Sequence, residues 1–228
     1  MTPRHRVWIA WLWTGSVGFV FWWMVFFYAP RERVMGDVQR IFYMHLPMAW
    51  TAMLLYIVSA GLHLAYIRTS RLRWIFRGYV AVWLGVACNV IALLTGMAWA
   101  KPIWGSWWPW EPRLTATFLM VLMYLVYILI FPTMAEHHRF RTLVVYNGLC
   151  LINVPIVYVA PRIWRGLHPV VIRGGDIEIE PRMWYTVLVG FVWAVSLMTL
   201  IAPRIRQWVE YRYTLVERLH ALQEQMHA

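Results

Sequence analysis

Residues 114–135 read LTATFLMVLMYLVYILIFPTMA, and this stretch decides the class of fold. It contains no charged side chain, and a helix of about 20 apolar residues is long enough to span the hydrocarbon core of a bilayer. No water is present in that core to bond the backbone, so a single segment must satisfy its own hydrogen bonds by forming a helix. The stretch therefore predicts a transmembrane helix.

Five further stretches of the same kind lie on the two sides of this one. Of the 228 residues, 61% are hydrophobic and 14% are charged, and the mean hydropathy is +0.54. This composition excludes a water-soluble globule and a disordered chain, and two cysteines are too few for a disulfide scaffold. We predict an all-α integral membrane protein with six transmembrane helices. They cover Val7–Ala29, Leu46–Ile67, Gly78–Ala100, Leu114–Ala135, Thr142–Ala160 and Met183–Pro203.

The distribution of basic residues predicts the orientation of this bundle. Six spans place both termini on one side of the membrane. With both termini in the cytoplasm, the short inner segments hold eight basic residues in 22, and the outer segments hold nine in 51. Because basic residues are concentrated in cytoplasmic loops, we predict cytoplasmic N and C termini. The net charge of +11 is then explained by topology and anionic lipid rather than by nucleic acid.

The chain divides into two parts on this basis. Residues 1–203 form the six-span bundle, and residues 204–228 form a cytoplasmic tail. Leucine and methionine recur at helical spacing in the tail, which predicts an amphipathic helix. Such a helix docks on a partner, lies on lipid or is simply solvated, and the sequence leaves these alternatives open. The recurring residues are Leu215, Leu219, Leu222 and Met226.

The outer segment between the third and fourth spans is rich in tryptophan. Residues 101–113 read KPIWGSWWPWEPR, and we call them the tryptophan segment. The first three indoles fall at positions i, i+3 and i+4, so a helical turn would place them on one face. An interfacial aromatic belt is the ordinary explanation, but four indoles in one loop, interleaved with Glu111 and Arg113, favour a flat surface for an apolar ligand. The four are Trp104, Trp107, Trp108 and Trp110.

Two of the eight histidines are predicted to lie on the outer side. His45 precedes the second span, and His168 lies in the loop after the fifth, so they occur in the loops before and after the tryptophan segment. Two imidazoles beside an aromatic surface are able to bind a metalloporphyrin as axial ligands, although a lone interfacial histidine is usually an ordinary amphipathic residue. Cations for the porphyrin carboxylates are also needed. The candidates are Lys101, Arg113, Arg162 and Arg165.

The polar residues within the spans have ordinary structural explanations. We expect His63 to be a hydrogen-bonded histidine inside the bundle, and Cys88 and Cys150 to be packed apolar residues. Asparagines 89, 147 and 153 are expected to bond between helices, and Pro132 and Pro155 to kink their spans. The chain has no Gly-x-x-x-x-Gly-Lys sequence and thus no P-loop for hydrolysing ATP.

Residues 104–115, WGSWWPWEPRLT, resemble the tryptophan-rich WWD signature of haem-handling proteins of cytochrome c biogenesis. Together with six spans, the chain length and the context Tyr43-Met44-His45-Leu46-Pro47, they resemble the haem exporter protein C family, CcmC. The signature usually carries Asp where this chain has Glu111, which sets the carboxylate one methylene further out.

The resemblance implies a function in haem transfer rather than an enzymatic one. Members of this family bind haem on the outer face of the bacterial inner membrane and present it to the haem chaperone CcmE, in an ABC-type assembly with CcmA, CcmB and CcmD. Carried over, the implied cargo is non-covalent haem b, with His45 and His168 as axial iron ligands. The tryptophan segment would hold haem and dock the chaperone, through Trp104, Trp107, Trp108, Trp110, Glu111 and Arg113.

Three other functions compete with this one. A cytochrome b-like subunit would place its histidine ligands on facing helices inside the bundle, where only His63 is found. A cytochrome c haem lyase would have to recognise an apocytochrome, for which the outer surface is small. A transporter subunit without a haem site of its own is the third alternative.

Overall fold

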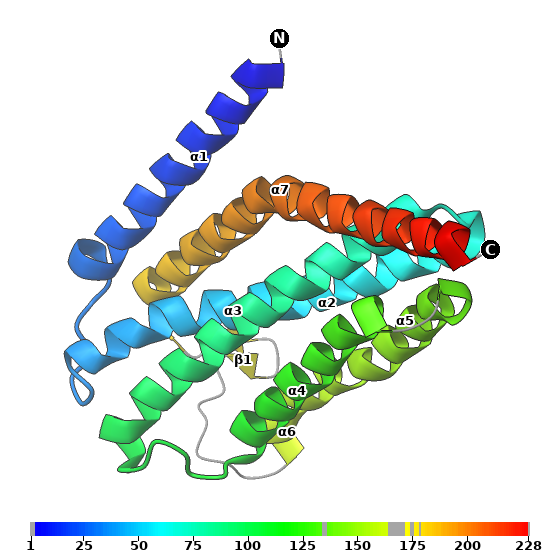
Figure 1. Ribbon diagram of the computed structural model, residues 1–228. Coiled ribbons are helices and arrows are strands. Elements are labelled where there is room, and N and C mark those ends of the chain that lie inside the picture. The colour runs from blue at the N-terminus through cyan, green and yellow to red at the C-terminus, as the bar shows by residue number, and fades with distance from the viewer. Residues whose placement is uncertain (1–2, 134–135, 164–171, 174–175, 178, 228) are drawn as a thin grey trace.

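The computed structural model describes residues 3–133, 136–163, 172–173, 176–177 and 179–227. Nearly all of these residues are helical (Figure 1). The α-helices are α1 (Pro3–Trp23), α2 (Ile41–Thr69), α3 (Leu72–Trp104), α4 (Pro112–Thr133), α5 (Glu136–Leu151), α6 (Asn153–Ile163) and α7 (Pro181–His227). A π-helical turn, η1 (Met24–Tyr28), continues α1, and a 3₁₀ turn, η2 (Asp37–Arg40), precedes α2. Two short antiparallel strands, β1 (Ile172–Arg173) and β2 (Asp176–Ile177), precede α7.

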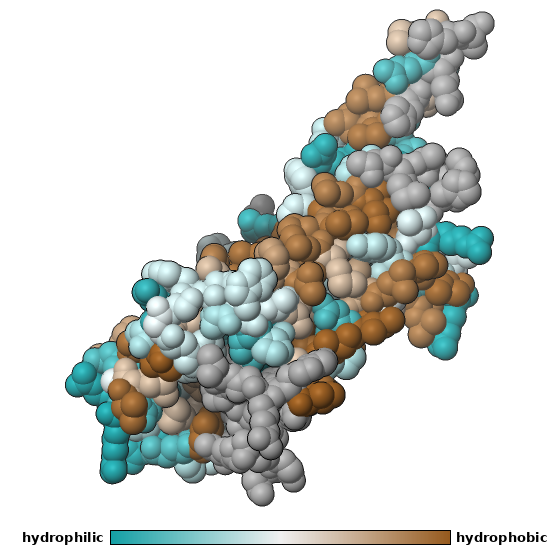
Figure 2. Space-filling view, turned by 90° about the horizontal axis from the view of Figure 1, so that it is seen from below, coloured by the Kyte–Doolittle hydropathy of each residue, from teal (hydrophilic) through white to brown (hydrophobic). Residues whose placement is uncertain are grey.

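Among the described residues, six helical segments are long and apolar enough to cross a membrane, in agreement with the six predicted spans. Figure 2 shows apolar surface over the middle of the molecule. From Val7 to Trp23, the exposed large side chains of α1 are apolar, as expected for a helix whose outer face meets lipid. They include Trp8, Leu12 and Phe19, which are 68%, 68% and 75% exposed.

The fifth span consists of two helices, as Pro155 predicted. α5 ends at Leu151 and α6 begins at Asn153. Proline has no N–H to donate to the carbonyl four residues earlier, which here is that of Leu151, and its ring clashes with that carbonyl. At the break, the amide of Ile152 bonds to the carbonyl of Leu149, three residues earlier, at 3.2 Å, which closes a tighter turn than that of an α-helix.

Glycines on α3 allow α2 to pack closely against it. A Cβ atom on Gly78, Gly85 or Gly96 would lie 2.6, 2.7 or 3.0 Å from a ring atom of a side chain on α2. These distances are shorter than ordinary carbon contacts of about 3.5–4.0 Å, so a larger residue would push the helices apart. The three rings belong to His63, Tyr56 and His45, respectively.

A buried polar cluster joins α2 to α4 and α5. His63 Nδ1 donates to the carbonyl of Ser59 at 2.7 Å, and Nε2 lies 2.9 Å from the hydroxyl of Tyr127. Asn147 donates to the Ser59 hydroxyl at 3.1 Å. His63 is 2% exposed, so the prediction of a hydrogen-bonded histidine inside the bundle is confirmed. Asn153 likewise bonds between helices, donating to the carbonyl of Ala116 at 3.1 Å.

α7 differs from the predicted sixth span in its extent. The helix passes Pro203 without ending and runs to His227, so no break in the helix separates the predicted bundle from the predicted tail. Figure 1 shows that α7 changes direction along its length. Its C-terminal half packs on the ends of α3, α4 and α5, where the ring of Tyr213 lies 5.3–6.1 Å from three phenylalanine rings. These are Phe76, Phe131 and Phe140.

Candidate ligand-binding cavity

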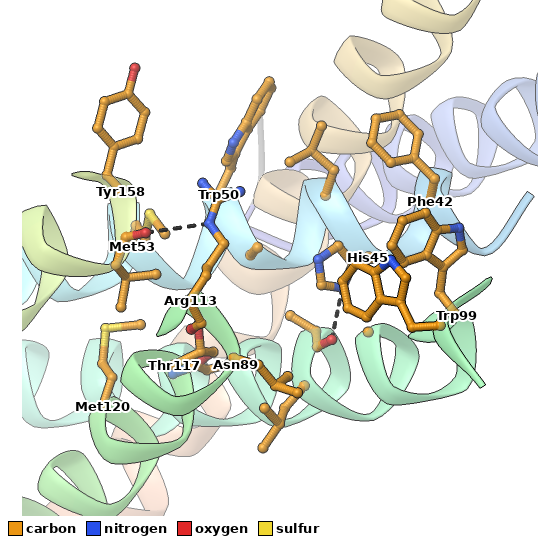
Figure 3. A pocket seen from close by; sticks show the side chains of 18 residues that line it. Phe42, His45, Trp50, Met53, Asn89, Trp99, Arg113, Thr117, Met120 and Tyr158 are labelled. Atoms are coloured by element: carbon orange, nitrogen blue, oxygen red, sulfur yellow. Dashed lines mark hydrogen bonds between the residues drawn. The ribbon is translucent and has the colours of Figure 1, made fainter. Parts of the chain in front are cut away.

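A cavity lies between α2, α3, α4 and α6, near the α3–α4 connection (Figure 3). The space between its walls, which includes solvent at the open mouth, is about 1030 Å³. Most of the lining side chains are apolar or aromatic. The polar ones are His45, Asn89, Arg113, Thr117 and Tyr158. An apolar cavity with a few polar groups is the usual form of a small-molecule site.

His45 is held in the cavity wall by the backbone of α3. Its Nδ1 atom lies 2.8 Å from the carbonyl oxygen of Ala92, which accepts only if Nδ1 carries the proton. Thr95 Oγ1 donates to the same carbonyl at 3.0 Å and lies 3.4 Å from Nδ1. Gly96 leaves room for the ring, because a Cβ there would approach His45 Cε1 to 3.0 Å. In this tautomer, Nε2 carries the lone pair and is the nitrogen able to ligate a metal.

Aromatic side chains from α2 and α3 form the walls around His45. Figure 3 shows Phe42 and Trp99 at the same end of the cavity as His45, with Trp50 further along α2. Trp104 also lines the cavity, and its ring packs edge-on against that of Trp99 at 5.2 Å and 81°. Flat, apolar walls of this kind suit a flat, apolar ligand.

Arg113, on the first turn of α4, lies between His45 and Tyr158 in the view of Figure 3. Its Nε donates to the carbonyl of Val157 at 3.3 Å, which ties α4 to α6. Among the described lining residues, Arg113 is the only Arg or Lys. The cavity therefore contains a histidine from α2 and a cation from α4.

The predicted helical face of tryptophans is not formed. α3 ends at Trp104, and Gly105 adopts a left-handed conformation (φ 73°) with its amide bonded to the carbonyl of Lys101 at 3.0 Å. This is the glycine-terminated end typical of helices, and it separates Trp104 from the next two indoles. Trp107 and Trp108 follow in a non-helical segment, so the prediction that the three share a helical face is wrong.

The remaining tryptophans lie along the α3–α4 connection. Trp108 packs edge-on against Phe118 of α4 at 5.5 Å and against Trp110 at 5.7 Å. Trp107 and Trp110 are 55% and 74% exposed. The tryptophan segment thus contributes one indole to the cavity and presents two at the surface.

Glu111 caps α4 instead of projecting from the loop. Its Oε2 accepts the amide of Leu114 at 3.0 Å, its own carbonyl accepts the amide of Thr115, and Pro112 follows as the first helical residue. This is the arrangement of an N-cap followed by proline. The side chain is 3% exposed, and within the described part of the chain its Oε1 has no hydrogen-bond partner.

The other predicted site residues fall elsewhere. His168 and Arg165 lie outside the described residues, as does the side chain of Arg162. Lys101 is exposed, and its Nζ donates to the carbonyl of Gly105 at 3.1 Å, at the end of α3. Of the predicted set, the structure brings together His45, Trp104 and Arg113.

Sequence reasoning missed the cavity residues that lie within the spans. Composition alone did not set Phe42, Trp50 or Trp99 apart, because Trp50 and Trp99 lie within predicted apolar spans and Phe42 lies just before one. A signal was present, since two sets of lining residues recur at intervals of four residues, and this spacing places residues on one side of a helix. The sets are Phe42, Leu46 and Trp50, and His45, Ala49 and Met53.

These features define a multi-pass helical membrane protein with an aromatic, histidine-bearing cavity near one end of its bundle. The family model described as "CcmC: Heme exporter protein C" matches residues 1–219. The chain therefore belongs to the haem exporter protein C family, which makes it a multi-pass membrane protein of cytochrome c biogenesis.

Relatives from bacteria and plants support this assignment. The chain is 28% identical over 207 residues to heme exporter protein C of Escherichia coli K12, covering 86% of this chain and 82% of the relative. It is 30% identical over 142 residues to a putative cytochrome c biosynthesis ccmC-like mitochondrial protein of Marchantia polymorpha, covering 61% of this chain and 59% of the relative. It is 30% identical over 141 residues to heme exporter protein C of Bradyrhizobium diazoefficiens, covering 61% of this chain and 54% of the relative.

Proposed function

We propose that this chain binds haem b non-covalently in the cavity beside His45 and presents it to a CcmE-like haem chaperone for c-type cytochrome biogenesis. The cavity faces the outer side of a bacterial inner membrane in the predicted topology. The observation that carries the proposal is the convergence of His45, Trp104 and Arg113 on one aromatic cavity. Family membership supports haem as the cargo.

The chemistry of His45 fits an iron ligand. The Ala92 carbonyl fixes the tautomer in which Nε2 has the lone pair, and this second-shell hydrogen bond also raises the basicity of the imidazole. Among the described residues, no group of three or more His, Cys, Asp or Glu is placed to hold a bare metal ion. A single histidine in an apolar cavity suits a metal that brings its own macrocycle.

The second axial ligand in this proposal is His168. Bis-histidine ligation fills both axial positions of the iron, which excludes oxygen and protects the cargo from side reactions. Release to the chaperone then requires that at least one histidine leave the iron. His45 is anchored on α2 by the backbone of α3, so we assign the exchangeable position to His168.

Arg113 fits the carboxylates of the cargo. Its guanidinium forms strong, charge-assisted hydrogen bonds with carboxylates, and an apolar cavity strengthens such bonds. Because Arg113 lies on α4 and bonds to α6, a porphyrin ligated by His45 would direct its propionates toward the α4–α6 side. Glu111 supports this position indirectly by capping the helix that carries Arg113.

The surface indoles provide a docking surface for the chaperone. Trp107 and Trp110 are exposed on the same connection that supplies Trp104 to the cavity. Exposed aromatic residues are favoured at protein interfaces, and here they adjoin the cargo site. The CcmA-, CcmB- and CcmD-like subunits implied by the family complete the assembly in this proposal and supply the ATPase that this chain lacks.

An interior haem of the cytochrome b kind is disfavoured by one observation. His63 is buried inside the bundle, and both of its ring nitrogens have hydrogen-bond partners. A haem lyase and a haem-free transporter subunit remain the alternatives, and thioether formation without the chaperone would indicate the lyase.

The test is an absorption spectrum of the protein purified in mild detergent. Wild type should carry haem with a low-spin, bis-histidine spectrum, and His45→Ala should lose it. His168→Ala should still bind haem, but with lower affinity and a changed spectrum. His5→Ala, an exposed position on α1, is the matched control. An unchanged spectrum in both His45→Ala and His168→Ala would refute the ligand assignment.

A further inference from the structure

The C-terminal half of α7 has two apolar faces, and only one of them is covered. The covered face carries Val209, which is 3% exposed, together with Tyr213 and Glu217 one and two turns later. Tyr213 contacts phenylalanines on three helices, and Glu217 forms an ion pair with Arg139 at 3.3 Å. This face fixes the tail across the end of the bundle that contains the start of α3, the end of α4 and the start of α5.

The uncovered face is a stripe of large apolar residues on the opposite side of the helix. The intervals between its members are seven, four, three and four residues, which is the spacing of a coiled-coil seam. At 3.6 residues per turn, the stripe is centred about half a turn from the covered face. Its members are Trp208, Leu215, Leu219, Leu222 and Met226, which are 54%, 43%, 51%, 56% and 75% exposed.

Basic residues without acidic partners border this stripe. Arg204, Arg212 and Arg218 are exposed, and within the described part of the chain none has a carboxylate at ion-pair distance. Arg212 lies over the ring of Trp208 at 5.2 Å. In contrast, Glu210 and Glu217 are paired with arginines, at 3.6 and 3.3 Å. The stripe therefore offers an apolar seam with unneutralised positive charge along its edges.

We propose that this stripe binds an amphipathic helix of a soluble cytoplasmic protein whose apolar seam is flanked by Asp and Glu. The arginine count predicts this end of the bundle to be cytoplasmic. A membrane surface is the less favoured occupant, because the face packed on the helix ends is the one directed toward the bilayer. A second copy is also disfavoured, since the arginines along the edges of the stripe would face arginines of the other copy.

Binding of designed helices to the haem-free full chain in phosphatidylcholine nanodiscs tests the proposal. Two fluorescent four-heptad peptides, both with Leu at the seam positions, serve as probes. The Glu peptide has Glu at the flanking positions, and the Lys peptide has Lys there. The Glu peptide should bind at least tenfold more tightly than the Lys peptide. Leu219→Asn should weaken its binding at least tenfold, whereas Thr214→Asn, at an exposed position outside the stripe, should leave binding unchanged. The double variant Arg212→Glu, Arg218→Glu should bind the Lys peptide more tightly than the Glu peptide.

Equal binding of both peptides, or binding of neither, would overturn the proposal. The other occupants have their own readouts. A spin label attached at Leu219→Cys should be relaxed mainly by a water-soluble nickel complex, which shows that position 219 faces water. Relaxation mainly by oxygen dissolved in the bilayer would indicate that the stripe lies on lipid. Reversible dimerisation that Leu219→Asn abolishes would indicate a second copy. Because no haem is present, failure of these tests leaves the proposed haem site unaffected.

Discussion

Replacing Gly96 with alanine should weaken haem binding without touching any iron ligand. The new Cβ would lie 3.0 Å from His45 Cε1 and 3.3 Å from Nδ1. Ordinary contacts of about 3.5 Å require the imidazole to shift by about 0.5 Å, which stretches or breaks its 2.8 Å hydrogen bond to Ala92. Loss of such a second-shell bond typically costs about 10–100-fold in metal affinity, or about 1.4–2.7 kcal/mol.

The assay is haem titration of the purified protein, followed by the midpoint potential of the bound haem. Gly61→Ala on α2 is the matched control, because its Cβ would meet nothing within 4 Å. The control should bind haem like wild type and fold at least as well, since alanine favours helices over glycine. If Gly96→Ala bound haem with wild-type affinity and potential, the role given to the His45–Ala92 bond would be wrong.

Three further outcomes are expected. Arg113→Ala should lower the affinity for haem about 10-fold or more. The affinity for haem dimethyl ester should stay unchanged, because this ligand has no free propionates, and an equal loss of affinity for both ligands would contradict the propionate assignment. Tyr127→Phe should destabilise the protein by about 1–3 kcal/mol, because buried His63 loses a hydrogen-bond partner, while the haem spectrum stays the same; thermal unfolding and absorption measure the two effects. Hydrogen bonds from the Met35 and Val34 amides lower the pKa of Glu32, so they should stabilise the 32–36 turn above the ordinary carboxylate pKa and be lost as the pH falls through the lowered pKa. Amide hydrogen exchange in the turn should therefore become faster at low pH, and Glu32→Gln should have the same effect at neutral pH.

The spans were predictable from the sequence because the bilayer imposes a local requirement. Residues 114–135 were assigned to a span on apolar length alone, and α4 occupies Pro112–Thr133. Pro155 likewise acts through its own missing N–H, so its effect on the fifth span follows without knowledge of neighbouring helices.

The conformation of the tryptophan segment depended on a single backbone angle. Spacing placed Trp104, Trp107 and Trp108 on one face only if the helix continued, and the left-handed turn at Gly105 ends it. Glu111 shows the same limit. Whether its carboxylate caps a helix or pairs with a cation depends on where α4 begins.

The walls of the cavity were hidden by the composition of the spans. In a soluble helix an apolar stripe marks the buried face, but in a membrane helix the lipid-facing side is apolar as well. Trp50 and Trp99 therefore did not stand out from the many aromatic residues that face lipid, such as Trp8. Only the packing of α2 against α3 and α4 shows which of them face the cavity.

The central claim is that His45 ligates haem iron inside this cavity. The most direct measurement is electron paramagnetic resonance of His45→Gly protein loaded with ferric haem, with and without ¹⁵N-labelled imidazole. The account predicts that the low-spin signal disappears in the variant and returns with imidazole, with hyperfine coupling to the labelled nitrogen. A low-spin signal identical to wild type in the absence of imidazole would contradict it.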